Sequence, residues 1–415
     1  MNINVQSEIG ELECVIIHTP GKEVEDMTPQ SAERALYSDI LNLSVVSREY
    51  SQFVGVLKKA AKVLEVRELL TEVVSNDTAK NQLLDRICLN EQVECIKDFL
   101  MDLHPREVAK YLIEGIPLEK DTLTKFVSSE KYSLQPLHNF FFSRDAAFVF
   151  NCRVVIARMA SRVREREALI METIFSYHPL FKGVEISNPL NQTDGNFIEG
   201  GDVLVGAKNI LLIGIGKRTN TRGIDFVIDS LKNYLDKFYV LVQELPPSPE
   251  SFIHLDMVFT ILDHNYCMIY SPVILNPSKF KTIKMCVENG KVISISEEEN
   301  LLRILNNLGF EYKPIFCGGD KDSWIQEREQ WHSGTNFFAL SPGRVIGYGQ
   351  NVYTIEALQK NGFEIIDALD IIDEKTDLNS YQRCVVTIDG SELSRGGGGC
   401  RCMTLPVFRK PSSTS

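Results

Sequence analysis

Apolar residues gather along this chain in short runs closed by turn residues, with longer amphipathic stretches between them. The first run, Cys14–His18, ends at Thr19-Pro20-Gly21 and predicts a strand followed by a turn. Comparable runs follow at 146–155, 196–205, 210–215, 257–269, 282–287, 292–295, 345–348 and 384–388. Stretches with helical period lie at 161–177, 224–238, 297–308 and 354–361. This alternation predicts an α/β fold along most of the chain.

One region departs from that rhythm. Between about residues 68 and 128, the segments TAKNQLLDRI, EQVECIKDFLMDL and PREVAKYLI place apolar residues three and four positions apart, with few β-branched runs. No linker rich in Pro, Gly or Ser flanks the region. We therefore expect an all-helical insertion at 68–128 within a single catalytic domain that spans 1–415.

Charge and composition argue against several functions. The 44 basic and 56 acidic residues give a net charge of −12 without any basic run, which disfavours nucleic acid or an anionic membrane as a partner. The N-terminus lacks a basic and apolar leader, and no apolar stretch reaches the roughly 20 residues that span a bilayer. The 10 cysteines are scattered through apolar runs, as in proteins of a reducing compartment. We expect a cytoplasmic protein.

Charged and nucleophilic residues recur beside the predicted strands. Asp145 and Glu199 are 54 residues apart, and Glu199 and His254 are 55 apart. Such spacing suggests repeated strand–helix modules that each send a charged residue to a shared centre. The motifs concerned are NFFFSRD (139–145), NFIEGGDV (196–203), IGIGKR (213–218), HLDMVFT (254–260) and RGGGGCRCMTLP (395–406).

The four glycines at 396–399 favour a structured loop close to a ligand, because the apolar segment MTLPVF follows at once. Such a loop would deliver Cys400 or Cys402 into a cavity, where a thiolate stabilised by positive charge is a nucleophile. A zinc site would need further His or Cys ligands at suitable spacing, and a redox pair would need a Cys-x-x-Cys helix start. We expect neither a metal nor another cofactor.

The carboxylates of Asp145, Glu199 and Asp256 indicate a site for a cationic substrate. A planar guanidinium has five donors and can pair with two carboxylates at once. Arg164 and Arg218 supply the opposite charge, as expected if the other end of the ligand is a carboxylate. A molecule with both groups is arginine.

The chain resembles the arginine deiminases of the guanidine-modifying (pentein) superfamily. The resemblance runs from HTPG at 18–21 to CMTLP at 402–406 and includes FSRD, EGGDV, HLD and REQW (328–331) in the family's order. It implies a pentein-type α/β propeller of about five strand–helix modules around a central active site, and a homodimer or homotetramer. The helical insertion fits, since arginine deiminases carry one and the shorter dimethylarginine hydrolases do not.

Residue by residue, the resemblance implies hydrolysis of free L-arginine to L-citrulline and ammonia through a covalent thiouronium on Cys402, with Cys400 as a bystander. The same resemblance assigns proton transfer to His254 and Glu199. It assigns binding of the guanidinium to Asp145 and Asp256. The remaining implied contacts are the α-carboxylate with Asn139, Arg164 and Arg218, and the α-ammonium with the backbone carbonyls of Leu36, Phe142 and Gly396.

Two positions depart from the family pattern. Gly397 stands where relatives often carry an arginine that gates the cysteine, with Arg395 and Arg401 on either side, and Ser143 stands where Thr is usual. Two other functions stay open at this point. An amidinotransferase would pass the amidino group to an amine instead of water, and a binding protein would keep the fold without turnover.

Overall fold

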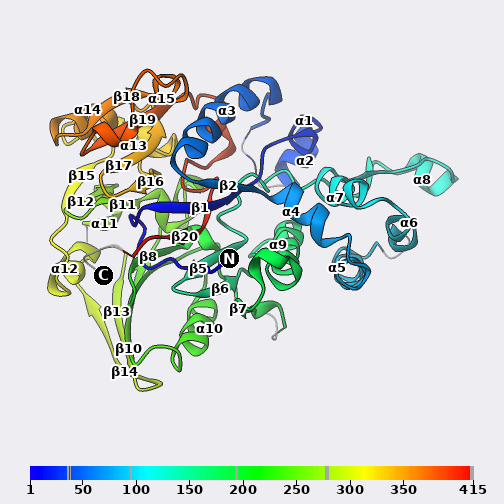
Figure 1. The fold of residues 1–415 in the computed structure, drawn as a ribbon, viewed down its shortest axis with the longest axis horizontal. Coiled ribbons are helices and arrows are strands. Elements are labelled where there is room, and N and C mark those ends of the chain that lie inside the picture. The colour runs from blue at the N-terminus through cyan, green and yellow to red at the C-terminus, as the bar shows by residue number, and fades with distance from the viewer. Residues whose placement is uncertain (35–36, 38, 94–95, 192–194, 276–279, 412–415) are drawn as a thin grey trace.

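The strands of the chain fall into six separate sheets in the computed structural model, which describes residues 1–34, 37, 39–93, 96–191, 195–275 and 280–411 (Figure 1). The mixed α/β class predicted from the hydrophobic pattern is confirmed. Within the described ranges, no helix is both long and apolar enough to cross a membrane.

Five sheets contain three to five strands, and the sixth is a two-stranded ribbon. Within each sheet the strands lie side by side in the following order: β2 (Lys62–Glu65), β1 (Leu12–Ile17) and β20 (Leu405–Arg409); β5 (Ala147–Phe150), β6 (Arg153–Ile156) and β7 (Glu185–Ser187); β14 (Lys291–Glu298), β13 (Thr282–Glu288), β10 (Lys237–Glu244), β9 (Ile210–Ile215) and β8 (Val203–Ala207); β11 (Phe259–Asp263), β12 (Tyr266–Ile269) and β15 (Lys313–Phe316); β16 (Phe338–Ser341), β17 (Arg344–Tyr348), β19 (Cys384–Ile388) and β18 (Glu364–Asp367); and β3 (Ile116–Pro117) with β4 (Tyr132–Leu134).

The same connection recurs in the larger sheets. An antiparallel strand pair is followed by a helix, and the chain then returns as a strand parallel to the second member, as in β8, β9 and β10. The helices in these returns are α3 (Leu43–Ala60), α9 (Glu165–Tyr177), α10 (Thr221–Leu231), α12 (Leu301–Asn307) and α14 (Val352–Lys360). The other short helices outside residues 66–127 are α1 (Lys22–Glu25), α2 (Pro29–Arg34), α11 (Ser271–Ile274), α13 (Ser323–Trp331) and α15 (Ala368–Ile372).

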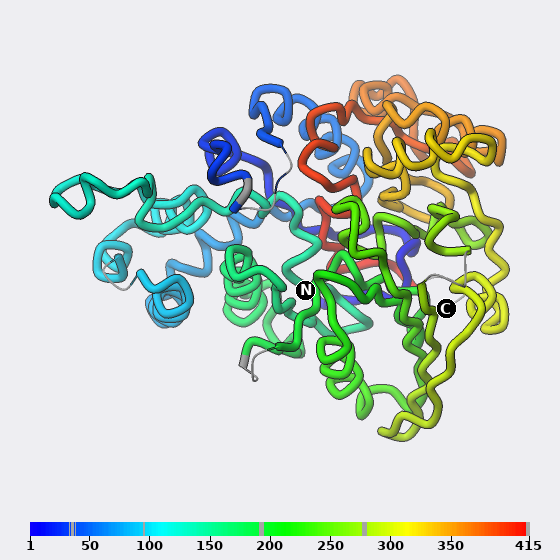
Figure 2. Tube along the Cα trace, turned by 180° about the vertical axis from the view of Figure 1, so that it is seen from behind, coloured from blue at the N-terminus to red at the C-terminus, as the bar shows by residue number. Residues whose placement is uncertain are grey.

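The two ends of the chain meet in one sheet. β1 pairs antiparallel with β20, so the blue and red segments run side by side in the middle of the molecule (Figure 2). Both strands are almost wholly buried, and their apolar side chains pack in the core. This pairing fixes the segment before β20, which carries Cys402, at the centre of the protein.

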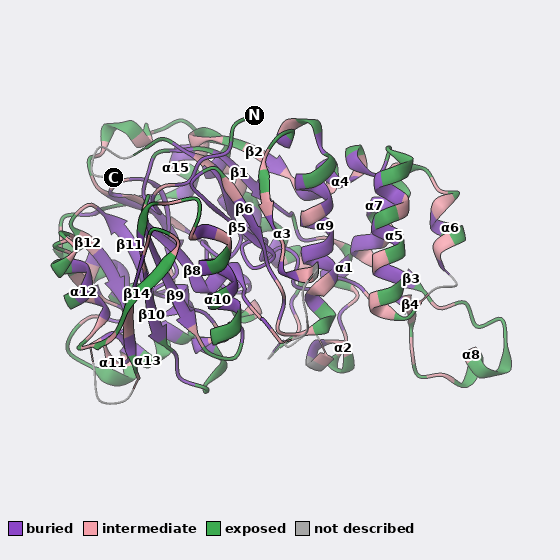
Figure 3. Ribbon diagram, turned by 90° about the horizontal axis from the view of Figure 1, so that it is seen from below, coloured by how far each residue is buried: buried purple, intermediate pink, exposed green. Residues whose placement is uncertain are grey.

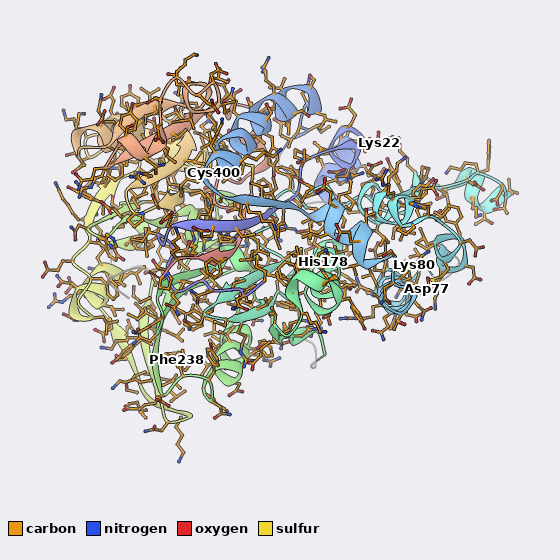
Figure 4. The ribbon with its side chains drawn as sticks, viewed as in Figure 1. Lys22, Asp77, Lys80, His178, Phe238 and Cys400 are labelled. Carbon is orange, nitrogen blue, oxygen red and sulfur yellow. The ribbon has the colours of Figure 1, made fainter. Side chains whose placement is uncertain are left out.

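Residues 66–127 form a helical arm on one side of the molecule (Figure 3). Its helices are α4 (Val66–Val73), α5 (Asp77–Glu91), α6 (Lys97–Met101), α7 (Pro105–Glu114) and α8 (Leu123–Val127). The expected all-helical run is interrupted at β3, because Gly115, with a φ of 81°, ends α7 and Pro117 lacks the N–H that a helix needs. At the base of the arm, His178 Nε2 at the end of α9 lies 2.9 Å from Glu72 Oε2 (Figure 4).

Three of the predicted elements differ from the structure in ways that the local sequence explains. The helix expected over 224–238 is wrong beyond Leu231, because Phe238 is fully buried in β10, a strand that the periodicity missed. The single strand expected over 146–155 is a hairpin of β5 and β6, since Asn151 takes a φ of 51° and turns the chain. The run 257–269 likewise divides into β11 and β12.

Candidate active site

Five polar side chains stand two to four residues before an edge strand of five different sheets: Asp145, Glu199, Asp256, Asn336 and Cys402. The segments that hold them converge around a cavity of about 230 Å³. Eight of the predicted site residues line its walls: Asn139, Phe142, Asp145, Arg164, Arg218, His254, Gly396 and Cys402. Glu199 and Asp256 are fully buried behind these walls, and Leu36 lies outside the described residues.

His254 is held between two carboxylates. Its Nε2 lies 2.9 Å from Glu199 Oε2, and its Nδ1 lies 3.6 Å from Asp145 Oδ1. Burial opposes a charge on the ring, but Asp145 and the hydrogen bond to Glu199 outweigh it and raise the pKa of His254 to about 9. The imidazole is therefore protonated at neutral pH and can donate a proton.

Glu199 keeps its charge although it is wholly buried. Burial alone would raise its pKa, but the positive charge of Arg218 and the hydrogen bond from His254 lower the pKa of Glu199 to about 2. Arg218 Nη1 lies 3.7 Å from Glu199 Oε1, and the backbone N–H of Ala160 donates to the same oxygen at 3.0 Å. Glu199 thus supports His254 without facing the cavity.

Arg164 is the second cation on this side of the cavity. It donates to Asp145 Oδ2 at 2.8 Å through Nη1, and it forms a forked pair with Glu167 at 3.0 and 2.7 Å. The other oxygen of Asp145, Oδ1, is buried and has no hydrogen-bond partner among the described residues, and the same is true of Arg218 Nη1. These two groups offer one acceptor and one donor of opposite charge near His254.

The thiol of Cys402 lies beside Asp256. Its Sγ is 3.7 Å from Asp256 Oδ2 and 4.0 Å from Oδ1. Burial, followed by the negative charges of Asp256 and Asp145, raises the pKa of Cys402 well above its usual range. The thiol is neutral under these conditions, and a cation placed between it and the carboxylates would lower its pKa.

Asn336 was missed in the sequence, although it anchors the loop that carries Cys402. Its Oδ1 accepts from the backbone N–H groups of Arg401 and Cys402 at 2.9 and 3.2 Å, and its Nδ2 donates to the carbonyl of Asp256 at 3.2 Å. Asn336 thus joins the two segments that carry the thiol and its neighbouring carboxylate. Its position directly before β16 matches that of Asp145 before β5, and that regularity could have indicated it.

The glycines of two motifs are required by close packing. A Cβ on Gly201 would lie 2.5 Å from His254 Nδ1, so the motif EGGDV leaves room for the imidazole. In the Gly-rich loop, a Cβ on Gly398 would lie 2.5 Å from Phe142, and one on Gly399 would lie 2.6 Å from Asn336 Cβ. The loop is therefore structured, as expected, and it packs tightly around the cavity.

Cys400 differs from Cys402 in its surroundings. It is fully buried, it is absent from the walls of the cavity, and burial raises the pKa of its thiol. Figure 4 places it in the interior of the main body. Nothing in this environment favours a thiolate at Cys400.

The arginines on either side of Gly397 have different settings. Arg395 lines the cavity and donates to Asp39 Oδ2 through Nε at 3.0 Å, whereas Arg401 is buried behind Cys402. Gly397 itself has a φ of 84°, and a Cβ there would meet nothing within 4 Å. Asp39, Arg395 and Trp331 line the cavity without having been predicted from the sequence, although Trp331 belongs to the REQW motif.

Asp145, Glu199 and His254 could also hold a metal ion, since each offers a ligand atom within 4.8 Å of the others. Arg164 Nη1 lies 2.8 Å from Asp145 and 3.9 Å from Glu199, and Arg218 lies near Glu199 as well. These cations already balance the carboxylates and would repel a divalent ion. The arrangement favours proton transfer over metal binding.

Comparisons of sequence and structure find known proteins that are similar to this chain. The family model described as arginine deiminase matches residues 33–409. Over 98% of both chains, the sequence is 32% identical to the arginine deiminase of Borrelia recurrentis and 31% identical to that of Listeria innocua. Among solved structures, a DDAH from Pseudomonas aeruginosa in complex with citrulline has the same fold, with a TM-score of 0.51, 15% identity and coverage of 95% of this chain and 99% of the other.

Proposed function

The chain belongs to the arginine deiminase family, and we propose on that basis that it hydrolyses free L-arginine to L-citrulline and ammonia with Cys402 as the nucleophile. The observation that carries the assignment of residues is the shared cavity, which brings Cys402, Asp145 and His254 together from three separate sheets. A thiol, a proton donor and carboxylates around one small cavity are what attack on a guanidinium requires.

Substrate binding generates the nucleophile in this proposal. A guanidinium held by Asp145 and Asp256 places its positive charge next to Cys402, whose pKa these carboxylates otherwise raise. The cation offsets that effect, so the thiolate forms when its target is in place. Asp145 Oδ1 supports this role, because it accepts no hydrogen bond from any described residue and a guanidinium N–H can donate to it.

The reaction then proceeds through two tetrahedral adducts. The Cys402 sulfur bonds to the guanidinium carbon, and the protonated His254 gives its proton to the departing amino group, so that the C–N bond breaks and ammonia leaves. A thiouronium on Cys402 remains. Water attacks the same carbon while the neutral His254 takes a proton from it. The second adduct collapses as the C–S bond breaks, which releases citrulline and the thiolate.

The other end of the substrate is assigned to the cationic side of the cavity. Arg218, Arg164 and Asn139 would bind the α-carboxylate. Nη1 of Arg218 supports this, because it makes no hydrogen bond with any described residue. The carbonyls of Phe142 and Gly396 would accept from the α-ammonium, and Leu36 is assigned the same role. In this assignment the substrate carboxylate takes over the Nη1 donor of Arg164 that Asp145 accepts from in the structure.

The proposal extends to architecture and setting. A single catalytic domain over 1–415, built as a propeller of five modules with the helical insertion at 68–128, is supported by the five larger sheets and their repeated strand–helix–strand connection. We place the protein in the cytoplasm as a homodimer or homotetramer, without nucleic acid, membrane or cofactor. The net charge of −12 supports the absence of a polyanionic partner.

One assay separates this function from its rivals. The protein is incubated with L-arginine alone and with L-arginine plus glycine or ornithine, and citrulline, ammonia and guanidino products are measured. Equal amounts of citrulline and ammonia from arginine alone are expected. Guanidino transfer without ammonia would identify an amidinotransferase instead, and binding without any product would identify a protein that has kept only the fold.

A further inference from the structure

A buried ion pair behind the cavity is not used by the proposed reaction. Arg401 precedes the nucleophile, is 1% exposed, and engages all three nitrogens of its guanidinium. Nε and Nη2 donate to Glu8 Oε2 and Oε1 at 2.9 and 3.0 Å, Nη1 donates to Asp256 Oδ2 at 2.8 Å, and Nη2 also donates to the carbonyl of Val203 at 2.7 Å. The two-bond pair with Glu8 fixes the orientation of the guanidinium and directs its Nη1 to Asp256.

Arg401 and the thiol share one oxygen atom. Asp256 Oδ2 accepts from Arg401 Nη1 and is also the carboxylate oxygen nearest to Cys402 Sγ, at 3.7 Å. The orientation of the Asp256 carboxylate is therefore set from behind by Arg401. The second carboxylate oxygen, Asp256 Oδ1, also lies near the thiol, at 4.0 Å from Cys402 Sγ.

Glu8 holds Arg401 from the N-terminal end of the chain. Its backbone N–H donates to the carbonyl of Val205 at 2.9 Å, and its Oε1 accepts from the Val205 N–H at 3.0 Å, so the residue is fastened to β8. Burial opposes its charge, but Arg401 outweighs burial and lowers the pKa of Glu8 to about 2. Glu8 is therefore ionised at neutral pH.

We propose that Glu8 and Arg401 are positioning residues that aim the Asp256 carboxylate at Cys402 and set the local charge behind the thiol. The inference rests on the proposed role of Cys402 as nucleophile. Glu8, Arg401 and Asp256 together carry one net negative charge. The buried cations Arg144 and Arg409 also face this group, and they are common to every variant. Removal of Glu8 makes the three-residue group neutral, whereas removal of Arg401 raises its net negative charge to two, so the two changes act on the thiol with opposite sign.

The test is the pH dependence of Cys402 alkylation by iodoacetamide, measured by mass spectrometry in a Cys400→Ser background so that one thiol of the C-terminal peptide reacts. In Glu8→Gln the midpoint of reactivity should fall by about one pH unit, which means alkylation about tenfold faster below the midpoint. In Arg401→Gln the midpoint should rise by about one unit. Arg401→Lys keeps the charge and should bring the midpoint back towards that of the parent protein.

Glu329→Gln is the matched control. Glu329 is also a buried carboxylate that accepts backbone N–H groups, from Tyr353 and Thr354, but it belongs to another part of the protein. Its substitution should leave the midpoint unchanged. Midpoints that shift in the same direction in Glu8→Gln and Arg401→Gln, or that do not shift, would overturn the proposal.

Folding and function are kept apart in this design. If Arg401→Gln does not fold, Glu8→Gln is compared with Glu8→Gln/Arg401→Gln, whose charge balance equals that of the parent. Adding the second change should reverse the shift, and a midpoint that stays lowered counts against the proposal. Alkylation needs no turnover of arginine, so a protein without deiminase activity would refute the proposed function and still leave this measurement informative.

Discussion

Asp145 and Asp256 are both expected to hold the guanidinium, yet the structure holds them in different ways. Asp145 lines the cavity and pairs with Arg164, which lines the cavity as well. Asp256 lies behind the thiol and pairs with Arg401, which is shut away from the cavity. A cation that the substrate can reach can change partners, whereas a buried one cannot. The side near His254 is therefore the adaptable half of the site, and the side near Cys402 is the fixed half.

The largest expected effect separates the two cysteines of the fixed half. Cys402→Ser should lower kcat by more than about 10⁴-fold, because a serine hydroxyl is not deprotonated by a bound guanidinium. Cys400→Ser should leave kcat within about threefold, since that thiol lies outside the cavity. Citrulline formation measures both. Similar activity in the two variants would show that Cys402 is not the nucleophile.

Substitution of the two carboxylates tests the comparison itself. Asp256→Asn should lower kcat by about 10²–10³-fold, because the charge beside the thiol is lost and Arg401 cannot adjust. Asp145→Asn should act mainly on KM, because Arg164 can move to the substrate when its partner is neutral. Steady-state kinetics with L-arginine distinguishes the two. The same split between kcat and KM in both variants would remove the distinction between a fixed and an adaptable half.

The sequence indicated the adaptable half better than the fixed one. Asp145, Glu199 and His254 stand beside strands at regular spacing, so the pattern of strands places them at one centre. Arg401 could not be interpreted in the same way, because its partners Glu8 and Asp256 are 393 and 145 residues away in the chain. The role of Asn336 also depends on tertiary contacts, with Cys402 and Asp256.

The fold, like the site, could be predicted only in part from the sequence. The α/β class follows from the alternation of strand-like and helix-like hydrophobic periods along the chain. The hairpins and β10 were not predicted, because an apolar run does not show where the chain turns. In β10, Phe238 and Val240 to Val242 are buried, and the strand pairs with β9 and β13 on its two sides. Both partner strands are distant from β10 in the sequence. The local pattern fits a helix or a strand, and pairing within the sheet selects the strand.

The pH dependence of kcat/KM should report on His254. The pKa of His254 is raised to about 9, so the proton it must donate is present below that pH and is lost as the pH rises through it. We expect kcat/KM to fall above about pH 9. Glu199→Gln removes the hydrogen-bonded charge that raises the pKa of His254, so the fall should begin at least about one unit lower. An unchanged alkaline limb would mean that another group donates the proton.

A smaller effect is expected at the carboxylate end of the substrate. Arg218→Ala should raise KM for L-arginine by about 10–100-fold, the loss of a charge-assisted hydrogen bond. Agmatine, which lacks the carboxylate, should be turned over slowly by the parent and no more slowly by the variant. An equal loss with both compounds would assign Arg218 to the support of Glu199 alone, at 3.7 Å from it.

The central claim is that Cys402 becomes covalently bonded to the guanidinium carbon, and mass spectrometry of the digested protein tests it most directly. A His254→Asn variant is mixed with L-arginine, quenched in acid and digested, since loss of the base should slow hydrolysis of the intermediate. We predict that the peptide containing Cys402 gains the mass of arginine less ammonia, and that Cys402→Ser abolishes this gain. The same adduct on Cys400, or its persistence without the Cys402 thiol, would contradict the account.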